Sequence, residues 1–77
     1  MDYYVELKFD PNLINVDEIS SEAEFSGGKL VEGYEENYSE YLAKVQFNDQ
    51  YSANDFLRSC RERYRFADLK GMVKRDW

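Results

Sequence analysis

The chain opens with a stretch in which apolar and polar side chains alternate. Over residues 3–9, the side chains at odd positions are apolar or aromatic and share one face, while Tyr4, Glu6 and Lys8 share the other. Successive side chains of a strand point to opposite faces, so this pattern predicts a strand with one buried face. The aspartate–proline pair at positions 10–11 ends it.

The second periodic stretch has the spacing of a helix. An asparagine followed by a glutamate at residues 15–18 resembles a capping box, and apolar residues then recur at helical intervals. This predicts a short helix over residues 16–25, ended by a Ser-Gly-Gly sequence. The alternative is a hairpin in which residues 23–25 form a strand that turns at Ser-Gly-Gly into residues 29–31.

Alternation returns in the middle of the chain and again at its end. Residues 29–36 and 39–47 are predicted as two strands joined by a short turn. Residues 68–75 are predicted as a closing strand, with Leu69 and Val73 facing inward.

A second helix is the most regular one in the sequence. Ser52 is predicted as its N-cap, with Asp55 three residues later in the position of a capping box. Apolar residues follow at helical spacing and form a stripe that should face the core. They are Ala53, Phe56, Leu57, Cys60 and Tyr64.

The predicted order of elements is strand, helix, strand, strand, helix, strand. This is the split β-α-β order of a ferredoxin-like α+β domain, in which a four-stranded antiparallel sheet carries both helices on one face. The expected domain covers residues 1–77, and the other face of its sheet is left bare. The residues predicted on the bare face are Tyr4, Glu6, Lys8, Leu42, Lys44 and Gln46.

The composition is that of a small folded protein. Aromatic residues make up 17% of the 77 positions, and their large area helps a chain of this length to build a core. Cys60 is the only cysteine, which fits a buried apolar residue in a reducing compartment. We find no signal peptide and no apolar stretch of about 18 residues, so we expect a cytoplasmic protein without a membrane partner.

Histidine, the usual general base and metal ligand, is missing from the chain. Cys60 lies on the apolar stripe without a base to activate its thiol. The acidic residues lack the spacing of a calcium loop, and the Ser-Gly-Gly sequence is too short to cradle a phosphate. We therefore expect a non-enzyme with no catalytic residue, no cofactor and no metal site.

Charge is divided unevenly between the two halves of the chain. Residues 1–40 carry eleven carboxylates and two lysines, residues 41–77 carry eight Lys and Arg residues and five carboxylates, and the net charge is −6. This asymmetry indicates a protein that presents charged surface to a partner.

The acidic half contains a segment in which glutamates are interleaved with tyrosines. Four glutamates stand among three tyrosines over residues 32–41, and four more carboxylates lie in the first predicted helix, so that together they could build an extended acidic face. Spaced carboxylates can imitate a phosphate backbone and occupy a basic nucleic-acid channel, with tyrosines as anchors. The alternative is a solvated acidic loop that aids solubility. The predicted partner-binding residues are Glu32, Tyr34, Glu35, Glu36, Tyr38 and Glu40.

The second predicted helix has a basic side. Arg58, Arg61 and Arg65 follow one another at i, i+3 and i+7. Their guanidinium groups can bind phosphate or an acidic partner. Equally, they can offset the helix dipole and pair with the acidic half of the same chain.

The order of elements and two short segments resemble RNA-recognition-motif domains. Tyr4 stands in a segment that resembles their shorter RNP motif, at the position where a base stacks, and residues 42–47 resemble the longer motif. The resemblance implies the same fold and, as an alternative function, single-strand binding through Tyr4, Lys8, Lys44 and the arginines of the second helix. Leu42 and Lys44 stand where those domains carry stacking aromatics, and an acidic chain forgoes attraction to phosphates.

In size and charge the chain is also similar to small acidic phage-encoded inhibitors of host nucleic-acid machinery, including anti-CRISPR proteins. The predicted function is recognition of a protein with a basic surface, as an inhibitor or regulator of a nucleic-acid-binding partner. Direct single-strand binding is one alternative. Another is an assembly module that forms a homodimer through the bare face or an edge strand and buries Leu42.

Overall fold

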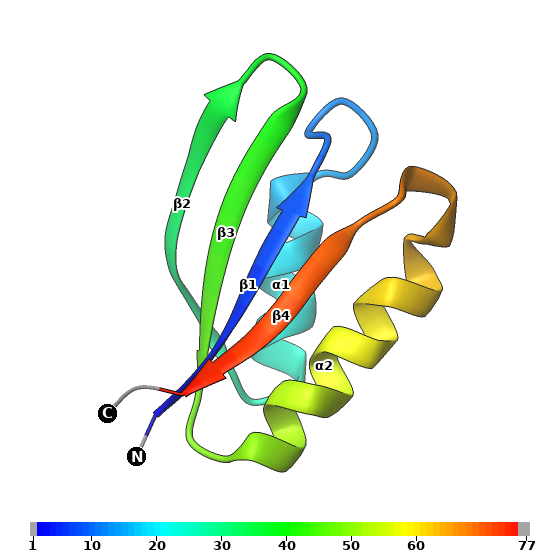
Figure 1. The fold of residues 1–77 in the computed structure, drawn as a ribbon. Coiled ribbons are helices and arrows are strands. Elements are labelled where there is room, and N and C mark those ends of the chain that lie inside the picture. Colours follow the sequence, from blue (N-terminus) through cyan, green and yellow to red (C-terminus); the bar gives the residue numbers. More distant parts are fainter. Residues whose placement is uncertain (1, 76–77) are drawn as a thin grey trace.

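The computed structural model describes residues 2–75 and has the predicted order of elements (Figure 1). Within these residues, four strands form one sheet, and two helices and a short 3-10 turn connect them. The α+β, ferredoxin-like prediction is therefore confirmed. The elements are β1 (Tyr3–Phe9), α1 (Val16–Phe25), β2 (Lys29–Asn37), β3 (Glu40–Phe47), α2 (Gln50–Arg63), η1 (Arg65–Ala67) and β4 (Lys70–Arg75).

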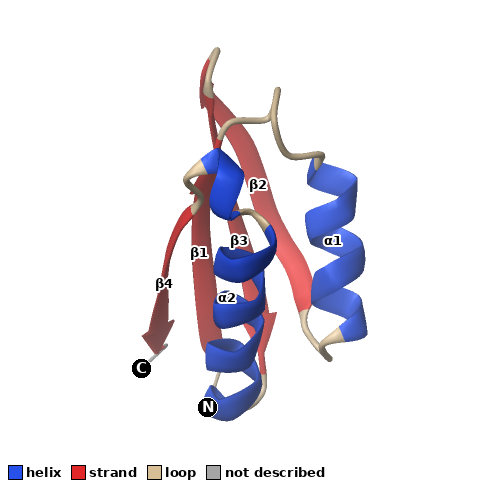
Figure 2. Ribbon diagram, turned by 90° about the vertical axis from the view of Figure 1, so that its right-hand side faces the viewer, coloured by secondary structure: helices blue, strands red, loops and turns tan. Residues whose placement is uncertain are grey.

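The sheet is antiparallel throughout and has the strand order β2-β3-β1-β4, which makes β2 and β4 its edges. Both helices cover the same face (Figure 2). The alternation of β1 places Val5, Leu7 and Phe9 under the helices, where they are almost completely buried. Across the core, the rings of Phe47 on β3 and Phe56 on α2 lie 5.3 Å apart between their centres.

The helix over residues 16–25 is confirmed, and the hairpin alternative is wrong. The Asn15 side chain accepts a hydrogen bond from the backbone N–H of Asp17 (2.8 Å), which satisfies a free donor of the first turn. At the other end, Gly27 has a φ of +88°, and the N–H of Gly28 donates to the carbonyl of Ala23 (2.8 Å). Glycine adopts this left-handed backbone without strain, so the Ser-Gly-Gly sequence ends the helix.

The second helix starts earlier than predicted, because Asp49 is its N-cap in place of Ser52. The Asp49 carboxylate accepts a hydrogen bond from the backbone N–H of Ser52 (2.9 Å), and this bonding holds the pKa of Asp49 below its usual value. An ionised acceptor at the positive end of a helix bonds more strongly than a hydroxyl, which explains the earlier start. The predicted apolar stripe is confirmed. Its buried members are Ala53, Phe56, Leu57, Cys60 and Tyr64.

The last strand is shorter than predicted and begins at Lys70. Residues 65–67 form η1, and Asp68 has a left-handed backbone with a φ of +52°. The chain therefore turns at Asp68 and cannot extend the strand there. Leu69 and Val73 nevertheless face the core, as predicted.

None of the helices formed by residues 2–75 has the length and apolarity needed to cross a membrane.

Candidate protein-binding surface

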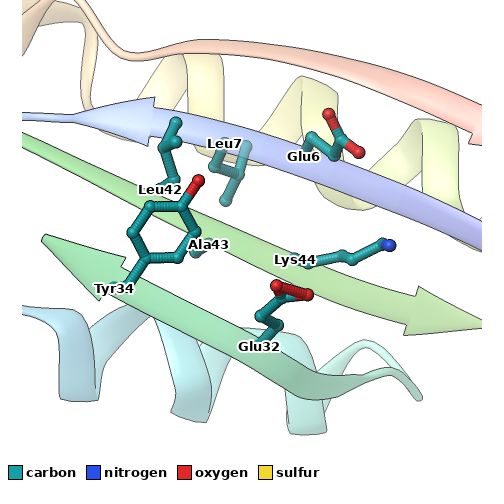
Figure 3. Close-up of a pocket in the computed structure, with 7 residues that line it drawn as sticks. All are labelled: Glu6, Leu7, Glu32, Tyr34, Leu42, Ala43 and Lys44. Atoms are coloured by element: carbon teal, nitrogen blue, oxygen red, sulfur yellow. The ribbon is translucent and has the colours of Figure 1, made fainter. Parts of the chain in front are cut away.

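The face of the sheet that the helices leave uncovered carries rows of paired side chains. Tyr34 on β2 pairs with Leu42 on β3, and Leu42 pairs in turn with Lys8 on β1. The neighbouring row contains Glu32 and Lys44 (Figure 3). Because paired residues of antiparallel strands project to the same side, β2 contributes Glu32 and Tyr34 to this face. The sequence pattern had placed only side chains of the first and third strands there.

Two shallow hollows flank Leu42 on this face. One has a volume of about 170 Å³ and is bounded by Tyr34 and Glu32 (Figure 3). The other has a volume of about 300 Å³ and lies toward Lys70 and Met72 of β4. Sites for small molecules usually measure about 300–1,000 Å³, so the first hollow is smaller than such a site and the second is at its lower limit. Both hollows have room for single side chains of a protein partner.

β2 and the turn that follows it are exposed along almost their whole length. Tyr34 has 51% of its surface exposed, and Tyr38, in the turn, has 88%. The backbone of the turn is nevertheless fixed. The Asn37 side chain accepts a hydrogen bond from the N–H of Ser39 (3.0 Å), and Asn12 donates one to the carbonyl of Tyr38 (3.3 Å). The hairpin therefore presents its tyrosines from a defined backbone.

Glu40 differs from the other predicted glutamates because its charge is already paired. Its carboxylate accepts a hydrogen bond from the Asn37 amide (2.7 Å) and lies 3.0 Å from the Lys8 ammonium. The bond from Lys8, followed by that from Asn37, holds the pKa of Glu40 below its usual value. In return, Glu40 raises the pKa of Lys8. Glu40 thus ties the hairpin to β1 and adds little free charge to the surface.

The three glutamates of β2 make no ion pair with any part of the chain between residues 2 and 75. Glu32 projects from the uncovered face, whereas Glu35 pairs with Tyr41 and projects toward the helix side. Glu36 lies close enough to Lys8 to raise its pKa. The structure therefore brings the predicted partner-binding residues together along one edge of the sheet, divided between its two faces.

Two of the four carboxylates of α1 are directed toward the second helix and not toward this edge. Glu22 lies 2.6 Å from Arg63 of α2, and Glu18 accepts a hydrogen bond from the hydroxyl of Tyr64 (3.0 Å). Both are directed at the second helix, and α1 lies on the side of the sheet opposite Glu32 (Figure 2). Part of the charge asymmetry of the chain is therefore neutralised within the fold.

The aromatic and lysine residues predicted for nucleic-acid binding share the uncovered face but are occupied by other contacts. The Lys44 ammonium lies 4.7 Å from the centre of the Tyr4 ring. This cation–π contact covers a ring face on which a base would stack. Lys8 is paired with Glu40, as described above.

The arginines predicted for the same role lie on the helix side of the sheet, away from Tyr4. Arg58 pairs with Asp55 one turn earlier in α2. Arg61 donates a hydrogen bond to the carbonyl of Gly71 on β4 (2.7 Å). Arg65 is exposed in η1. The fold thus splits the alternative nucleic-acid-binding set into two groups.

Cys60 is 2% exposed within the apolar stripe of α2. Burial, with a smaller effect of the Glu22 charge, raises the pKa of its thiol to about 12. The thiolate that a nucleophile or metal ligand requires is therefore scarce near neutral pH. Among residues 2–75, no group of acidic and cysteine side chains is placed to hold a metal ion.

β4 brings three further residues to the uncovered face that the sequence reasoning missed. Lys70, Met72 and Lys74 each pair with a residue of β1 on that face, and Lys74 lies 3.2 Å from the Glu6 carboxylate. Their alternation with the inward Val73 was the signal in the sequence that could have placed them there.

Comparison with known proteins identifies the fold and no family. No family model matches the chain, and no curated protein matches it. Formyltetrahydrofolate deformylase from Burkholderia mallei is similar in structure, with a TM-score of 0.71 at 6% identity. The match covers 97% of this chain, which spans 28% of the deformylase chain. The de novo designed protein Foldit4 is similar over the full length of both chains, with a TM-score of 0.65 at 11% identity.

Proposed function

We propose that the chain is a non-enzymatic protein-binding module that docks through its acidic edge. The acidic edge consists of β2 and the turn after it, and its partner is a protein with a basic surface. The observation that carries this proposal is that one exposed edge strand combines exposed tyrosines with three carboxylates that form no ion pair with residues 2–75. The residues of the acidic edge are Glu32, Tyr34, Glu35, Glu36 and Tyr38.

The two residue types of the acidic edge have different roles in binding. Tyrosine provides a large contact area at low entropic cost, and truncation of a true anchor costs about 2 kcal/mol or more. Exposed carboxylates steer a basic partner toward the edge and raise the association rate in a salt-dependent way. Tyr34 and Tyr38 are therefore the proposed anchors, and the glutamates select the partner.

A basic partner of this kind is a protein that itself binds nucleic acid. Carboxylates spaced along a rigid strand can take the places of phosphates, so the module acts as an inhibitor or regulator of that partner in the cytoplasm. Small acidic phage proteins such as anti-CRISPR proteins are the class it would join. Direct nucleic-acid binding has less support, because Lys8 and Lys74 on the uncovered face are paired with glutamates.

The test is affinity capture from an extract of the native host at low salt, with and without nuclease, followed by identification of what is retained. The Tyr34→Ala/Tyr38→Ala variant removes both anchors. Tyr51→Ala is the matched control, because Tyr51 is 78% exposed on α2, outside the acidic edge. We expect a nuclease-resistant protein partner that the wild type and the control retain and the double variant loses. Capture that nuclease abolishes would favour the single-strand-binding alternative, and equal retention by the double variant would contradict the anchors.

A further inference from the structure

The two edges of the sheet carry opposite charge. β4 has three cationic side chains and no carboxylate over Lys70–Arg75, whereas β2 has three glutamates between residues 32 and 36. Within the described residues, neither edge pairs with a further strand. An edge strand exposes a row of unpaired N–H and C=O groups, which makes it a template for pairing with another chain.

The strand directions also make the two edges compatible. Each strand is antiparallel to its neighbour in the order β2-β3-β1-β4, so β2 and β4 run in opposite directions. A second copy placed beside the first in the same orientation therefore has its β2 antiparallel to the first copy's β4. We propose that the chain associates head to tail, with β4 of one copy pairing with β2 of the next and extending the antiparallel sheet.

One register of this pairing matches side chains at three positions along the two edges, of which Glu36 lies at the irregularity between Glu35 and Asn37. It places one lysine–glutamate pair on each side of a methionine–tyrosine pair. Lys70, Met72 and Lys74 of one copy then lie opposite Glu36, Tyr34 and Glu32, respectively, of the next copy. Met72 is 54% exposed and Tyr34 51% exposed, so their contact covers apolar surface that the monomer leaves open. Opposite-charge and aromatic pairs directly across two strands stabilise a sheet.

Charge also disfavours the two symmetric pairings of the same edges. Antiparallel pairing of β4 with a second β4 around Met72 places Lys70 opposite Lys74. Pairing of β2 with a second β2 brings two sets of glutamates from residues 32–36 together. Like charges opposite one another destabilise a sheet, so the pairing of unlike edges is selected.

Two contacts that β4 makes within each copy are compatible with the pairing of the edges. Lys74 lies 3.2 Å from Glu6, and Arg61 donates a hydrogen bond of 2.7 Å to the carbonyl of Gly71. Lysine has three donors and a carbonyl has two acceptor sites, so both contacts can persist beside a new strand. A contact made by one short strand is small, and we therefore expect weak association that falls as salt increases.

This pairing rests on the proposed function, because its acceptor is the acidic edge and the second copy is one partner with a basic surface. A partner bound at that edge excludes the second copy, so self-association and partner binding compete. A head-to-tail interface leaves a free edge at each end of the assembly. The assembly therefore grows as a filament or closes into a ring.

The test is analytical sedimentation of the purified protein over a wide concentration range at low and high salt. The Lys70→Glu/Lys74→Glu variant and the Glu32→Lys/Glu36→Lys variant each place like charges across the interface. We expect the wild type to associate at low salt and each variant to associate at least about tenfold more weakly. Mixing the two variants restores opposite charges at every interface between unlike copies, so association should return. Circular dichroism establishes that each variant is folded.

The register has its own test by disulfide trapping. A mixture of the Tyr34→Cys and Met72→Cys variants should form a cross-linked dimer under mild oxidation. Glu35→Cys is the matched control for Tyr34→Cys, because Glu35 projects to the opposite face of the sheet. Cys60 is buried and does not compete. Equal cross-linking of Met72→Cys with both partners would overturn the register.

A wild type that stays monomeric at its highest soluble concentration, or a mixture of variants that fails to associate, would overturn the pairing. The Asp17→Lys/Glu24→Lys variant is the control for Glu32→Lys/Glu36→Lys, because it changes the net charge by the same amount but on α1. It should associate like the wild type. The proposed function is tested separately, because the Lys70→Glu/Lys74→Glu variant keeps the whole acidic edge. If that variant captures a partner while the wild type never self-associates, only the head-to-tail pairing fails.

Discussion

Arg63 at the end of α2 lies 2.6 Å from Glu22 on α1 and so joins the basic and acidic halves of the chain. The Arg63 side chain is 58% exposed, and exposed ion pairs contribute at most about 1 kcal/mol. We expect Arg63→Gln to lower the free energy of unfolding by less than about 1 kcal/mol, and by less still at high salt. Urea denaturation at two salt concentrations measures both effects. A larger loss that salt does not reduce would contradict this view of the pair.

Gly71 determines how closely α2 packs on β4. A Cβ atom at this position would lie 2.5 Å from Cδ1 of Leu57 and 2.8 Å from Cδ2 of Leu7, and both leucines are buried. We therefore expect Gly71→Ala to lower the free energy of unfolding by about 1–3 kcal/mol, because the core must shift to admit a methyl group. Lys70→Ala, at the exposed neighbour, is the control and should change stability little. Equal stability of the two variants would show that this contact is not tight.

The fold should lose stability at alkaline pH through two groups on α2 and just after it. Burial raises the pKa of Cys60 from 9.0 to about 12, and burial with the hydrogen bond to Glu18 raises that of Tyr64 from 10.0 to about 12. Both groups stay protonated in the folded chain at a pH where the unfolded chain ionises. The stability that these two protonated groups contribute to the fold is therefore fully present below pH 9 and is lost as the pH rises toward 12.

Unfolding by urea at pH 8 and pH 11 measures this loss. We expect Cys60→Ala and Tyr64→Phe each to reduce the difference between the two conditions, because each removes one ionising group. Tyr51→Phe, at an exposed tyrosine, should leave the difference unchanged. A wild type that is equally stable at both values would contradict the raised pKa values.

The Lys8–Glu40 pair should protect the hairpin within a defined pH range. The pKa of Glu40 is lowered from 4.5 and that of Lys8 is raised from 10.5. The stability that the Glu40 carboxylate contributes is present above pH 4.5 and is lost as the pH falls through its lowered pKa. The stability that the Lys8 ammonium contributes is present below pH 10.5 and is lost as the pH rises through its raised pKa. We expect the wild type to exceed Glu40→Gln in urea resistance at pH 7 and to lose this advantage progressively as the pH falls below 4.5. Glu24→Gln, on α1, should show no such pattern.

Local patterns were enough to predict most of the fold. Both ends of β1 were predicted correctly, because the alternation of its side chains and the proline that follows are local signals in the sequence. The helical spacing of apolar residues and the Asn15 cap favoured α1 over a hairpin, and the Asn15 side chain does cap the helix by accepting a hydrogen bond from Asp17. The predicted start of α2 was wrong because Ser52 has a residue type that commonly caps helices, whereas Asp49, three residues earlier, is the N-cap in the structure.

The candidate site was harder to predict from the sequence, because it depends on pairing between segments that are distant in the chain. Alternation along β2 places Glu32 and Glu35 on opposite faces, but only the register of β2 against β3 shows that Glu32 is the one on the uncovered face. The same holds for Glu22, which the sequence assigned to an acidic face and the fold directs to Arg63. Side-chain spacing alone could predict neither the face on which Glu32 lies nor the contact between Glu22 and Arg63.

The most direct test of the central claim asks whether the position of the negative charge matters, or only its amount. Glu32→Gln/Glu36→Gln and Asp17→Asn/Glu24→Gln raise the net charge equally, the first at the acidic edge and the second on α1. Capture of the partner is measured for both against a salt gradient. Docking through the acidic edge predicts that the first variant releases the partner at much lower salt, while the second behaves like the wild type. Equal release from both variants would contradict the account, since bulk charge would then explain the binding.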